Sequence, residues 1–577
     1  MAVRTLHFRD KQQLSHWSRN VLGRLRFAVD HARFKKRMGA APLEEALWGG
    51  FATTSLAILE VQANDGGDTA LHHAWARTRH ARAVGDEEAA LQWLDRTVEL
   101  GDWRREPVDL ALYRAGVLEA LGRGGEALEL VRRLHRRYGN DTTILFALAS
   151  AASCAGEPAD NVLKWINRAY RRAGLDGLSV DPGCAHATLA TLATPLRRSD
   201  RTPLVSVIMP MHNAEATVDY AVRAILAQTE ARLELIVVDD ASTDGSVEAA
   251  FAAARGDARV RIIQQEQNQG AYAARNRGLA EARGRYITVN DADDWSHQSR
   301  LALQCEHLER GAPFCTTSGI SVLRDLRIAP HPRNARAIRE NLSSLMLRTD
   351  ELRALGGWDE VRFGADSELY ERLRARHGCS RRMVKRGVPL AFLLRGAGSL
   401  TANSATGAWS SRYGARREYK EAYRRWHRSE TTLVMGTTRP FPAPAIALQR
   451  DPPTHQFDLL LVGDLRDDLT TLTISEPSSQ IGVLHVPAPR AINAPAHPTV
   501  RGKLHAGKWQ SLVPGERARC DRVLILSANV YRTPPDLLPV IEAGAIVLCD
   551  GAADPPKARI ARLFGVDVAD VAVVADE

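Results

Sequence analysis

The most regular hydrophobic pattern in the chain lies between residues 204 and 289, where short apolar runs alternate with segments of helical spacing. The apolar runs are rich in β-branched residues, as buried strands are, and cover Leu204–Pro210, Leu233–Val238, Val260–Ile263 and Tyr286–Val289. Between them, Ala216–Ala227 and Ala271–Ala282 place their apolar side chains at helical intervals. Strands that alternate with crossover helices predict a parallel sheet.

Polar clusters follow three of these predicted strands. They are His212-Asn213, Asp239-Asp240 and the trio Asp291, Asp293 and Asp294. Because ligands of parallel sheets bind beyond the carboxyl ends of the strands, the clusters predict a functional site at that edge. Carboxylates so close together repel one another unless a cation lies among them, and hard oxygen ligands suit Mg²⁺ or Mn²⁺ and hence a diphosphate. The alternative is an acidic turn that caps a helix beginning at Ser296.

Residues 1–200 show helical periodicity throughout. Around Leu112–Leu128 and Phe146–Val162 the pattern repeats at a spacing of 34 residues, so that Leu121-Gly122 corresponds to Ala155-Gly156. A period of this length is typical of paired helices in tetratricopeptide repeats, and the alternative is an ordinary helical bundle. This domain carries no catalytic cluster, so we expect it either to bind a protein partner or to brace the domain that follows.

A second α/β pattern begins near residue 456. Its predicted strands are Phe457–Val462, Ile481–Val486, Arg522–Leu526 and Ala545–Cys549. A segment rich in Pro and Ala precedes it and is the best linker candidate. The sequence therefore predicts a multidomain protein: a helical domain over 1–200, a central α/β domain over 201–430, a linker over 431–455 and a smaller Rossmann-like α/β domain over 456–577.

Composition and charge limit the cellular compartments and the binding partners that fit this protein. The 577 residues are 45% hydrophobic and 25% charged, and the net charge of +9 comes from 68 Arg and 9 Lys. Nucleic-acid-binding proteins often carry a basic stripe with interleaved aromatic residues, and this sequence has none. The positive charge fits an acidic polysaccharide better, or peripheral association with an anionic membrane face. The start lacks a secretory signal, no apolar run is long enough to span a bilayer, and the seven scattered Cys fit a reducing compartment. We expect a cytoplasmic protein.

The central motifs resemble those of a known enzyme family. The runs V-S-V-I-M-P-M-H-N, L-I-V-V-D-D-A-S-T-D-G-S, N-Q-G-A-Y-A-A-R-N-R-G and R-Y-I-T-V-N-D-A-D-D-W are similar, in order and spacing, to the nucleotide-sugar half of the family 2 glycosyltransferases. The resemblance covers about residues 203–401. It implies the A-type glycosyltransferase fold and inverting transfer of a sugar from a nucleoside diphosphate sugar, usually a UDP-sugar, to a hydroxyl of a glycan or glycolipid acceptor, assisted by Mn²⁺ or Mg²⁺.

The same resemblance implies roles for individual residues on the donor side. Asp239 would contact the nucleobase, with Asp240 beside it, and His212 and Asn213 would pack the base, although the family more often has Tyr at the position of His212. Arg275 would reach the nucleotide. Asp291 would face the ribose and Asp293 the metal, with Asp294 left open as an alternative metal ligand.

On the acceptor side, the run L-G-G-W-D-E-V-R-F-G-A-D-S-E-L resembles the family's turn before the catalytic base. Aligned on the following helix, Asp366 matches the base that accepts the proton of the acceptor hydroxyl. Ala365 stands where the family often has Glu. The alternative is that Asp366 or Ser367 caps the helix Glu368–Arg376, and Glu368 is then the next candidate base. The segment Gly396–Gly398 lacks the His that relatives often carry, which makes a third metal ligand there doubtful.

The last domain carries one short resemblance. The phrase L-P-V-I-E-A-G-A-I-V-L-C-D is similar to the end of a B-type glycosyltransferase half, which would put Glu542 at a helix start facing a ribose. Two alternatives to a single-site glycosyltransferase therefore stay open. One is a bifunctional chain-building transferase that uses both α/β domains, and the other is a helical-repeat scaffold with an inactive transferase domain.

Overall fold

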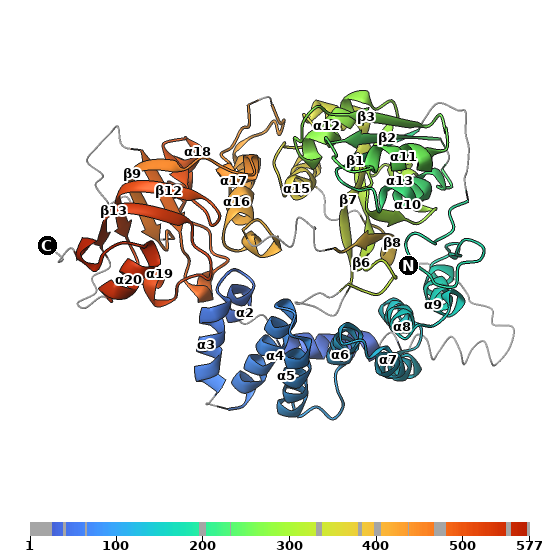
Figure 1. Ribbon diagram of the computed structural model, residues 1–577, viewed down its shortest axis with the longest axis horizontal. Helices are drawn as coiled ribbons and strands as arrows, with labels where there is room; N and C mark the ends of the chain where they lie inside the picture. The colour runs from blue at the N-terminus through green and yellow to red at the C-terminus, as the bar shows by residue number, and fades with distance from the viewer. Residues whose placement is uncertain are drawn as a thin grey trace.

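The computed structural model describes residues 23, 26–38, 42–63, 66–195, 204–230, 232–329, 337–378, 383–396, 405–436, 438–466, 480–549 and 556–573. A layer of helices lies beneath two separate sheets, which Figure 1 shows in green to yellow and in orange to red. Within the described residues, no helix combines the length and the apolar character that crossing a bilayer requires.

The first domain is a row of antiparallel helices. They are α2 (Pro42–Leu47), α3 (Ala52–Ala63), α4 (Asp68–Ala83), α5 (Glu87–Leu100), α6 (Val108–Ala120), α7 (Gly124–Tyr138), α8 (Thr142–Cys154) and α9 (Ala159–Arg172). Helices α6 and α8 have 13 residues each and start 34 positions apart. Gly122 and Gly156, which follow them, both adopt a positive φ, of 73° and 74°. Because that conformation favours glycine, the repeat predicted from sequence reflects a repeated helix–turn–helix unit.

The central sheet has eight strands in the order β3-β2-β1-β4-β7-β6-β8-β5. Its parallel half consists of β1 (Val205–Met211), β2 (Leu233–Asp239), β3 (Val260–Gln264) and β4 (Tyr286–Val289). The predicted parallel strands are thus confirmed. The other half contains β5 (Asp294–Ser296), β6 (Phe314–Val322), β7 (Ile338–Arg348) and β8 (Met383–Leu394), and β7 runs antiparallel to both β4 and β6.

The helices of this domain are α10 (Val218–Leu226), α11 (Ser246–Ala254), α12 (Ala271–Glu281), α13 (Arg300–Glu309), α14 (Thr349–Ala354) and α15 (Ala365–His377). One expectation is wrong. No helix begins at Ser296, because Asp294–Ser296 forms β5 against β8 and α13 starts only at Arg300. The acidic trio therefore does not cap that helix.

Helix α16 (Ala415–Ser429) and the short α17 (Ala445–Leu448) connect the two sheets. The second sheet is entirely parallel, in the order β11-β10-β9-β12-β13-β14. Its strands are β9 (His455–Gly463), β10 (Ile481–His485), β11 (Trp509–Ser511), β12 (Arg517–Ile525), β13 (Val540–Leu548) and β14 (Val571–Val573), with helices α18 (Pro498–His505), α19 (Asn529–Arg532) and α20 (Lys557–Phe564). The placement of Glu542 at a helix start is wrong, since Glu542 lies inside β13 and forms an exposed ion pair with Arg519.

The helical domain contacts both sheets. At one end, the Tyr170 hydroxyl donates to the carbonyl of Pro389 at 3.0 Å, and the rings of Phe146 and Phe392 lie 6.4 Å apart. At the other end, the carboxylate of Asp536 accepts hydrogen bonds from the first amides of α3, at 2.5 and 3.0 Å. The helices therefore brace the two α/β domains (Figure 1).

Candidate functional site

Asp239 is the last residue of β2, and its side chain is buried. The residue is 2% exposed, and its Oδ2 accepts a hydrogen bond from the Ser242 amide at 3.3 Å. Its Oδ1 is buried without a hydrogen-bond partner. Buried carboxylate oxygens are almost always paired, so this atom is suited to accept a hydrogen bond from a ligand.

Asp240, the next residue, is fully engaged by the protein. Its two oxygens accept hydrogen bonds from the amides of Gln269, at 2.7 Å, and Gly270, at 2.8 Å. Gly270 has a φ of 92°, which lets the chain turn sharply into α12. Asp240 thus fixes the start of the helix that carries Arg275, and its predicted contact with a nucleotide stays a prediction.

His212 and Asn213 lie in an exposed loop directly after β1. Nδ1 of His212 lies 2.9 Å from the Asp240 carbonyl oxygen, and Oδ1 of Asn213 accepts a hydrogen bond from the Thr243 amide at 2.8 Å. These contacts join the loops after β1 and β2. The structure thereby brings His212, Asn213 and Asp239 to one edge of the sheet, as the sequence pattern predicted.

Arg275 is the centre of the site. It is 3% exposed, and its two terminal nitrogens contact Oδ1 of Asp366 at 2.5 Å and Oδ1 of Asp291 at 2.9 Å. Its guanidinium also lies over the ring of Tyr272, 5.0 Å from the centroid. Burial alone lowers the pKa of Arg275, but Asp366 and Asp291 outweigh that effect and raise the pKa above its ordinary value. Arg275 is therefore permanently charged, and it joins a strand end to the start of α15.

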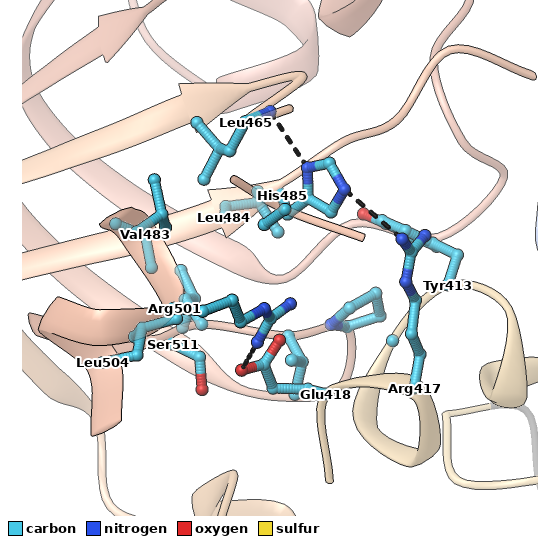
Figure 2. Close-up of a pocket in the computed structure, with 16 residues that line it drawn as sticks. Tyr413, Arg417, Glu418, Leu465, Val483, Leu484, His485, Arg501, Leu504 and Ser511 are labelled. Atoms are coloured by element: carbon cyan, nitrogen blue, oxygen red, sulfur yellow. Dashed lines mark hydrogen bonds and ion pairs between the residues drawn. The ribbon is translucent and has the colours of Figure 1, made fainter. Parts of the chain in front are cut away.

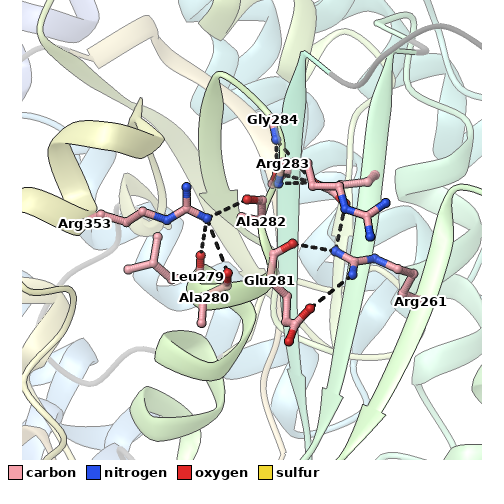
Figure 3. Close-up of polar contacts among 10 residues, drawn as sticks. Arg261, Leu279, Ala280, Glu281, Ala282, Arg283, Gly284 and Arg353 are labelled. Carbon is pink, nitrogen blue, oxygen red and sulfur yellow. Dashed lines mark hydrogen bonds and ion pairs between the residues drawn. The ribbon is translucent and has the colours of Figure 1, made fainter.

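Several contacts hold α12 in place and so position Arg275. Gly278 packs against Ile208 of β1 so closely that a Cβ there would come within 2.7 Å of it. Arg353 donates to the Leu279 and Ala282 carbonyls at 2.9 and 2.6 Å, which satisfies the end of the helix (Figure 3). Asn276 exchanges two hydrogen bonds with the backbone of Trp358, at 2.9 and 3.0 Å. The Gly-Gly-Trp turn is thus anchored to α12.

The acidic residues after β4 differ in environment. Asp291 is partly exposed and accepts from the Ser343 hydroxyl at 3.0 Å. Burial and then the charge of Asp291 raise the pKa of Asp293 to about 6. Burial, Asp293 and Asp291 raise the pKa of Asp294 well above its ordinary value, and its Oδ1 accepts a hydrogen bond from the Leu394 amide. The side chain of Asp294 therefore binds β5 to the end of β8. Asp293 is the better candidate for a metal ligand.

The carboxylates of this site form only part of the ligand shell of a divalent cation. Among the residues that the structure describes, no three His, Cys, Asp or Glu side chains converge to form a complete metal site. Mg²⁺ and Mn²⁺ prefer oxygen ligands, and Mg²⁺ commonly takes one or two carboxylates and completes its shell with water and substrate phosphates. Asp293, with Asp291 beside it, can supply that minimal set. The repulsion between their carboxylates would be relieved by such a cation.

Asp366 lies in the first turn of α15. The N-cap position belongs to Gly364, and no side chain caps the helix, so the interpretation of Asp366 as a cap is wrong. Its oxygens instead accept from the Tyr272 hydroxyl at 3.1 Å and from Arg275. The other candidate base, Glu368, is fully buried and contacts Arg372 at 3.0 Å and His427 at 2.9 Å, which leaves Asp366 as the accessible carboxylate.

Sequence reasoning missed three neighbours of this centre: Tyr272, Ser343 and Arg416. Tyr272 could have been found, because it precedes Arg275 by three residues on a predicted helix and so shares its face. Burial lowers the pKa of Arg416, which lies near Tyr272 and Asp366 although it belongs to α16. No sequence signal points to Arg416 or to Ser343, since both reach the site through the tertiary fold.

Two stretches of the chain match known protein families. Residues 206–357 match the model of glycosyl transferase family 2, and residues 108–151 match a tetratricopeptide repeat. Residues 206–357 are thus a family 2 glycosyltransferase domain, and the helical-repeat prediction is confirmed for residues 108–151.

Individual relatives match the same central part of the chain. The succinoglycan biosynthesis protein ExoO of Rhizobium meliloti is 31% identical over 177 residues, which cover 30% of this chain and 49% of ExoO. Glycosyltransferase GlyG of Streptococcus pneumoniae is 44% identical over 91 residues, covering 16% of this chain and 30% of GlyG. The chain covers less than two thirds of the length of the curated relatives it matches.

Among solved structures, TarS of S. aureus in complex with UDP-GlcNAc is similar over 39% of this chain and 65% of TarS, with 18% identity and a TM-score of 0.30.

Proposed function

Because residues 206–357 form a glycosyl transferase family 2 domain, we propose that this protein is an inverting glycosyltransferase. It would move a sugar from a nucleoside diphosphate sugar, in the first place a UDP-sugar, to a hydroxyl of a glycan or glycolipid in polysaccharide or glycoconjugate assembly. The observation that carries the proposal is the position of Arg275 between Asp291 and Asp366. One cation there joins a carboxylate on the donor side to a carboxylate on the acceptor side.

The donor half of the proposal rests on unsatisfied polar groups at the sheet edge. The buried Oδ1 of Asp239 is suited to accept an N–H of the nucleobase, next to the exposed loop of His212 and Asn213. Arg275 and Asp293 would meet the diphosphate that follows the base. A bound Mn²⁺ or Mg²⁺ would neutralise the charge of the diphosphate leaving group.

The acceptor half of the proposal rests on Asp366. In the structure, Arg275 holds its Oδ1 at 2.5 Å and so occupies one of the two carboxylate oxygens. A diphosphate would draw the guanidinium toward itself, and Asp366 would then be available to take the proton of an acceptor hydroxyl. The hydroxyl would attack the anomeric carbon on the face opposite the diphosphate, which inverts the configuration.

Two further points concern a possible second active site and the side of the membrane on which the reaction takes place. A second active site in the C-terminal sheet has no support from Glu542, because that residue pairs with Arg519 on the surface of β13. We place the reaction on the cytoplasmic side of a membrane, with at most peripheral association, on the strength of the arginine-rich composition.

The test is a panel of nucleotide sugars offered to the purified protein with Mn²⁺, with Mg²⁺ and with EDTA. We expect one donor to be hydrolysed slowly in the presence of the cation, with release of the nucleoside diphosphate. Hydrolysis should fall in a Asp366→Asn variant that still binds the donor. Failure of every nucleotide sugar to bind would favour the scaffold interpretation instead.

A further inference from the structure

A strongly basic groove lies between α16 and the second sheet, outside the site described above. Its volume is about 490 Å³, and Arg or Lys supply eight of its sixteen lining residues, against one acidic residue, Glu421. One wall is α16, and the other comes from the segment around Ile492–Pro498 and from Arg466 and Arg501. The groove is therefore hollow and positively charged, as a binding site for an anionic chain would be.

Part of this positive charge is balanced within the protein. Arg412 pairs with Glu45, Arg424 pairs with Glu371 at 2.6 Å, and Arg466 pairs with Asp464 at 2.7 Å. Within the described residues, Lys420, Arg425 and Arg428 have no carboxylate partner. Three cations thus remain available to a ligand on one wall of the groove.

Three cations follow one face of α16. Lys420, Arg424 and Arg428 follow one another at intervals of four residues, so they line one face of α16. Like charges at this spacing destabilise a helix. Burial and then the charge of Arg424 lower the pKa of Lys420. Glu371 offsets the charge of Arg424, so Lys420 and Arg428 are the two charges of this row that a ligand could pair.

Two residues of the groove, Arg417 and Arg501, also line a neighbouring pocket, which Figure 2 shows. Arg501 of α18 donates there to Glu418 at 2.5 Å, and Nη2 of Arg417 lies 3.5 Å from Nε2 of His485. Burial and Arg417 lower the pKa of His485 to about 4, so its imidazole is neutral and its Nδ1 accepts from the Leu465 amide at 3.0 Å. These contacts fix α16 against the second sheet.

Helix α16 also connects the groove to the transferase centre. Arg416, in its first turn, lies near Asp366, whereas Arg424 pairs with Glu371 on α15. Glu371 follows Asp366 by five residues, or ~8 Å along the axis of α15. The same helix therefore borders both the groove and the carboxylate that we propose as the base.

The chemistry of the groove distinguishes between classes of polyanion. A bilayer presents a broad flat surface, which a concave groove cannot follow. Single-stranded nucleic acid needs exposed aromatic rings on which bases stack, but Tyr419, Tyr423 and Trp426 of α16 are buried. A linear glycan with repeated carboxylate or phosphate groups needs only spaced cations and polar edges, and both are present.

We propose that this groove binds a polyanionic glycan and that this glycan is the acceptor chain on which the transferase acts. Binding of the glycan stands independently of catalysis, and only its assignment as the acceptor rests on the proposed function. The cations would lie along the anionic groups of the chain, and its growing end would reach Asp366.

The test is direct binding of a fluorescein-labelled polygalacturonate oligomer to the full-length protein, measured by anisotropy at increasing salt. The variant carries Lys420→Ala, Arg425→Ala and Arg428→Ala together. Its matched control carries Arg104→Ala, Arg105→Ala and Arg136→Ala, which remove the same charge from exposed positions of the helical domain. We expect the groove variant to lose about ten- to hundredfold in affinity and the control less than about twofold.

Three comparison ligands and a measurement of donor hydrolysis separate the possible explanations of a loss of binding. Neutral dextran should not bind, and labelled single-stranded DNA and phosphatidylglycerol vesicles should bind more weakly than the glycan. Equal losses in the two variants, no binding by wild type, or stronger binding of DNA or vesicles would overturn the proposal. Donor hydrolysis should be the same in wild type and groove variant, so that a defect in the catalytic centre is recognised separately.

Discussion

At the scale of single residues, Arg275 sets the electrostatics of the catalytic centre. It is buried, it is charged, and its guanidinium touches one carboxylate from β4's end and one from the start of α15. Removing either carboxylate would leave a buried cation with less compensation, which is costly. Substitutions at this centre therefore need controls that separate folding from chemistry.

The first prediction concerns Asp366. Asp366→Asn keeps the size of the side chain and one acceptor oxygen but removes the charge that accepts a proton. We expect donor binding to survive and sugar transfer to fall by about 10²–10⁴-fold, the range of general base catalysis. Binding and transfer should be measured on the same preparation. Tyr272→Phe, which removes only the hydroxyl that donates to Asp366, is the control and should cost far less. Near-normal transfer by Asp366→Asn would exclude this residue as the base.

The second prediction concerns Asp293. We propose its carboxylate as the protein ligand for a cation that would bridge to the diphosphate. Asp293→Ala should lower the affinity for the nucleoside diphosphate in Mn²⁺ by one to two orders of magnitude, or about 1.4–3 kcal/mol. Isothermal titration calorimetry measures this directly. If wild type binds the nucleotide equally well in Mn²⁺ and in EDTA, a metal bridge through Asp293 is contradicted.

At the scale of elements, the turn between α14 and α15 positions the acceptor side. Gly356 has a φ of 79°, and a Cβ there would lie 1.8 Å from the carbonyl oxygen of Met435. The following Gly357 has a φ of 74° and packs against Asn276, which also binds the backbone of Trp358. Two glycines thus allow the turn to dock onto α12 beside Arg275.

The third prediction follows from this close approach. Gly356→Ala should lower the free energy of unfolding by ~3 kcal/mol or more, because both the backbone conformation and the clash disfavour it. Gly378→Ala is the control, since Gly378 also has a positive φ, of 57°, but no atom lies within 4 Å of its added Cβ. It should cost only ~1 kcal/mol. Urea unfolding of both variants measures the difference, and equal midpoints would show that the turn can shift.

At the scale of the whole molecule, the helical domain acts as a brace whose contact with the transferase domain includes a buried acid. The Ser150 hydroxyl donates to Oε2 of Glu119 at 2.5 Å and accepts from the Ile328 amide at 2.8 Å. Burial raises the pKa of Glu119 to about 7, and the nearby cations Arg82 and Arg327 only partly oppose it. Glu119 therefore keeps its proton in the folded protein below neutral pH.

The fourth prediction is a pH dependence of stability. The folded protein holds the Glu119 proton up to about pH 7, whereas the unfolded chain loses it near pH 4.5, its ordinary value. This group's contribution is therefore complete below pH 4.5 and is lost as the pH rises through 7, by up to ~3 kcal/mol. Glu119→Gln cannot ionise, so it should be more stable than wild type at pH 8 and similar to it at pH 5.

The measurement is urea unfolding of wild type and variant between pH 5 and 8. Glu129→Gln on α7 is the control, because Glu129 is exposed and forms a surface ion pair with Arg133. Its stability should follow that of wild type across the range. A Glu119→Gln variant that loses stability at pH 8 would contradict the prediction.

The sequence by itself determined the alternation of strands and helices in the central domain, because buried strands and amphipathic helices leave strong local periodicities. It also determined that His212, Asp239 and Asp291 meet at one edge, since the carboxyl ends of parallel strands must. The 34-residue spacing identified the helix pairs α6–α7 and α8–α9 for the same reason: the signal lies within one repeat.

Only the tertiary structure decided which of these groups are available for chemistry. Asp240 and Glu368 carry carboxylates, as Asp239 and Asp366 do. The fold occupies Asp240 with backbone amides and Glu368 with Arg372 and His427. The basic groove is likewise absent from the local pattern. Its walls are about 70 residues apart in the chain and meet only because α16 docks on the second sheet, and contacts at such separations leave no periodic trace in a sequence.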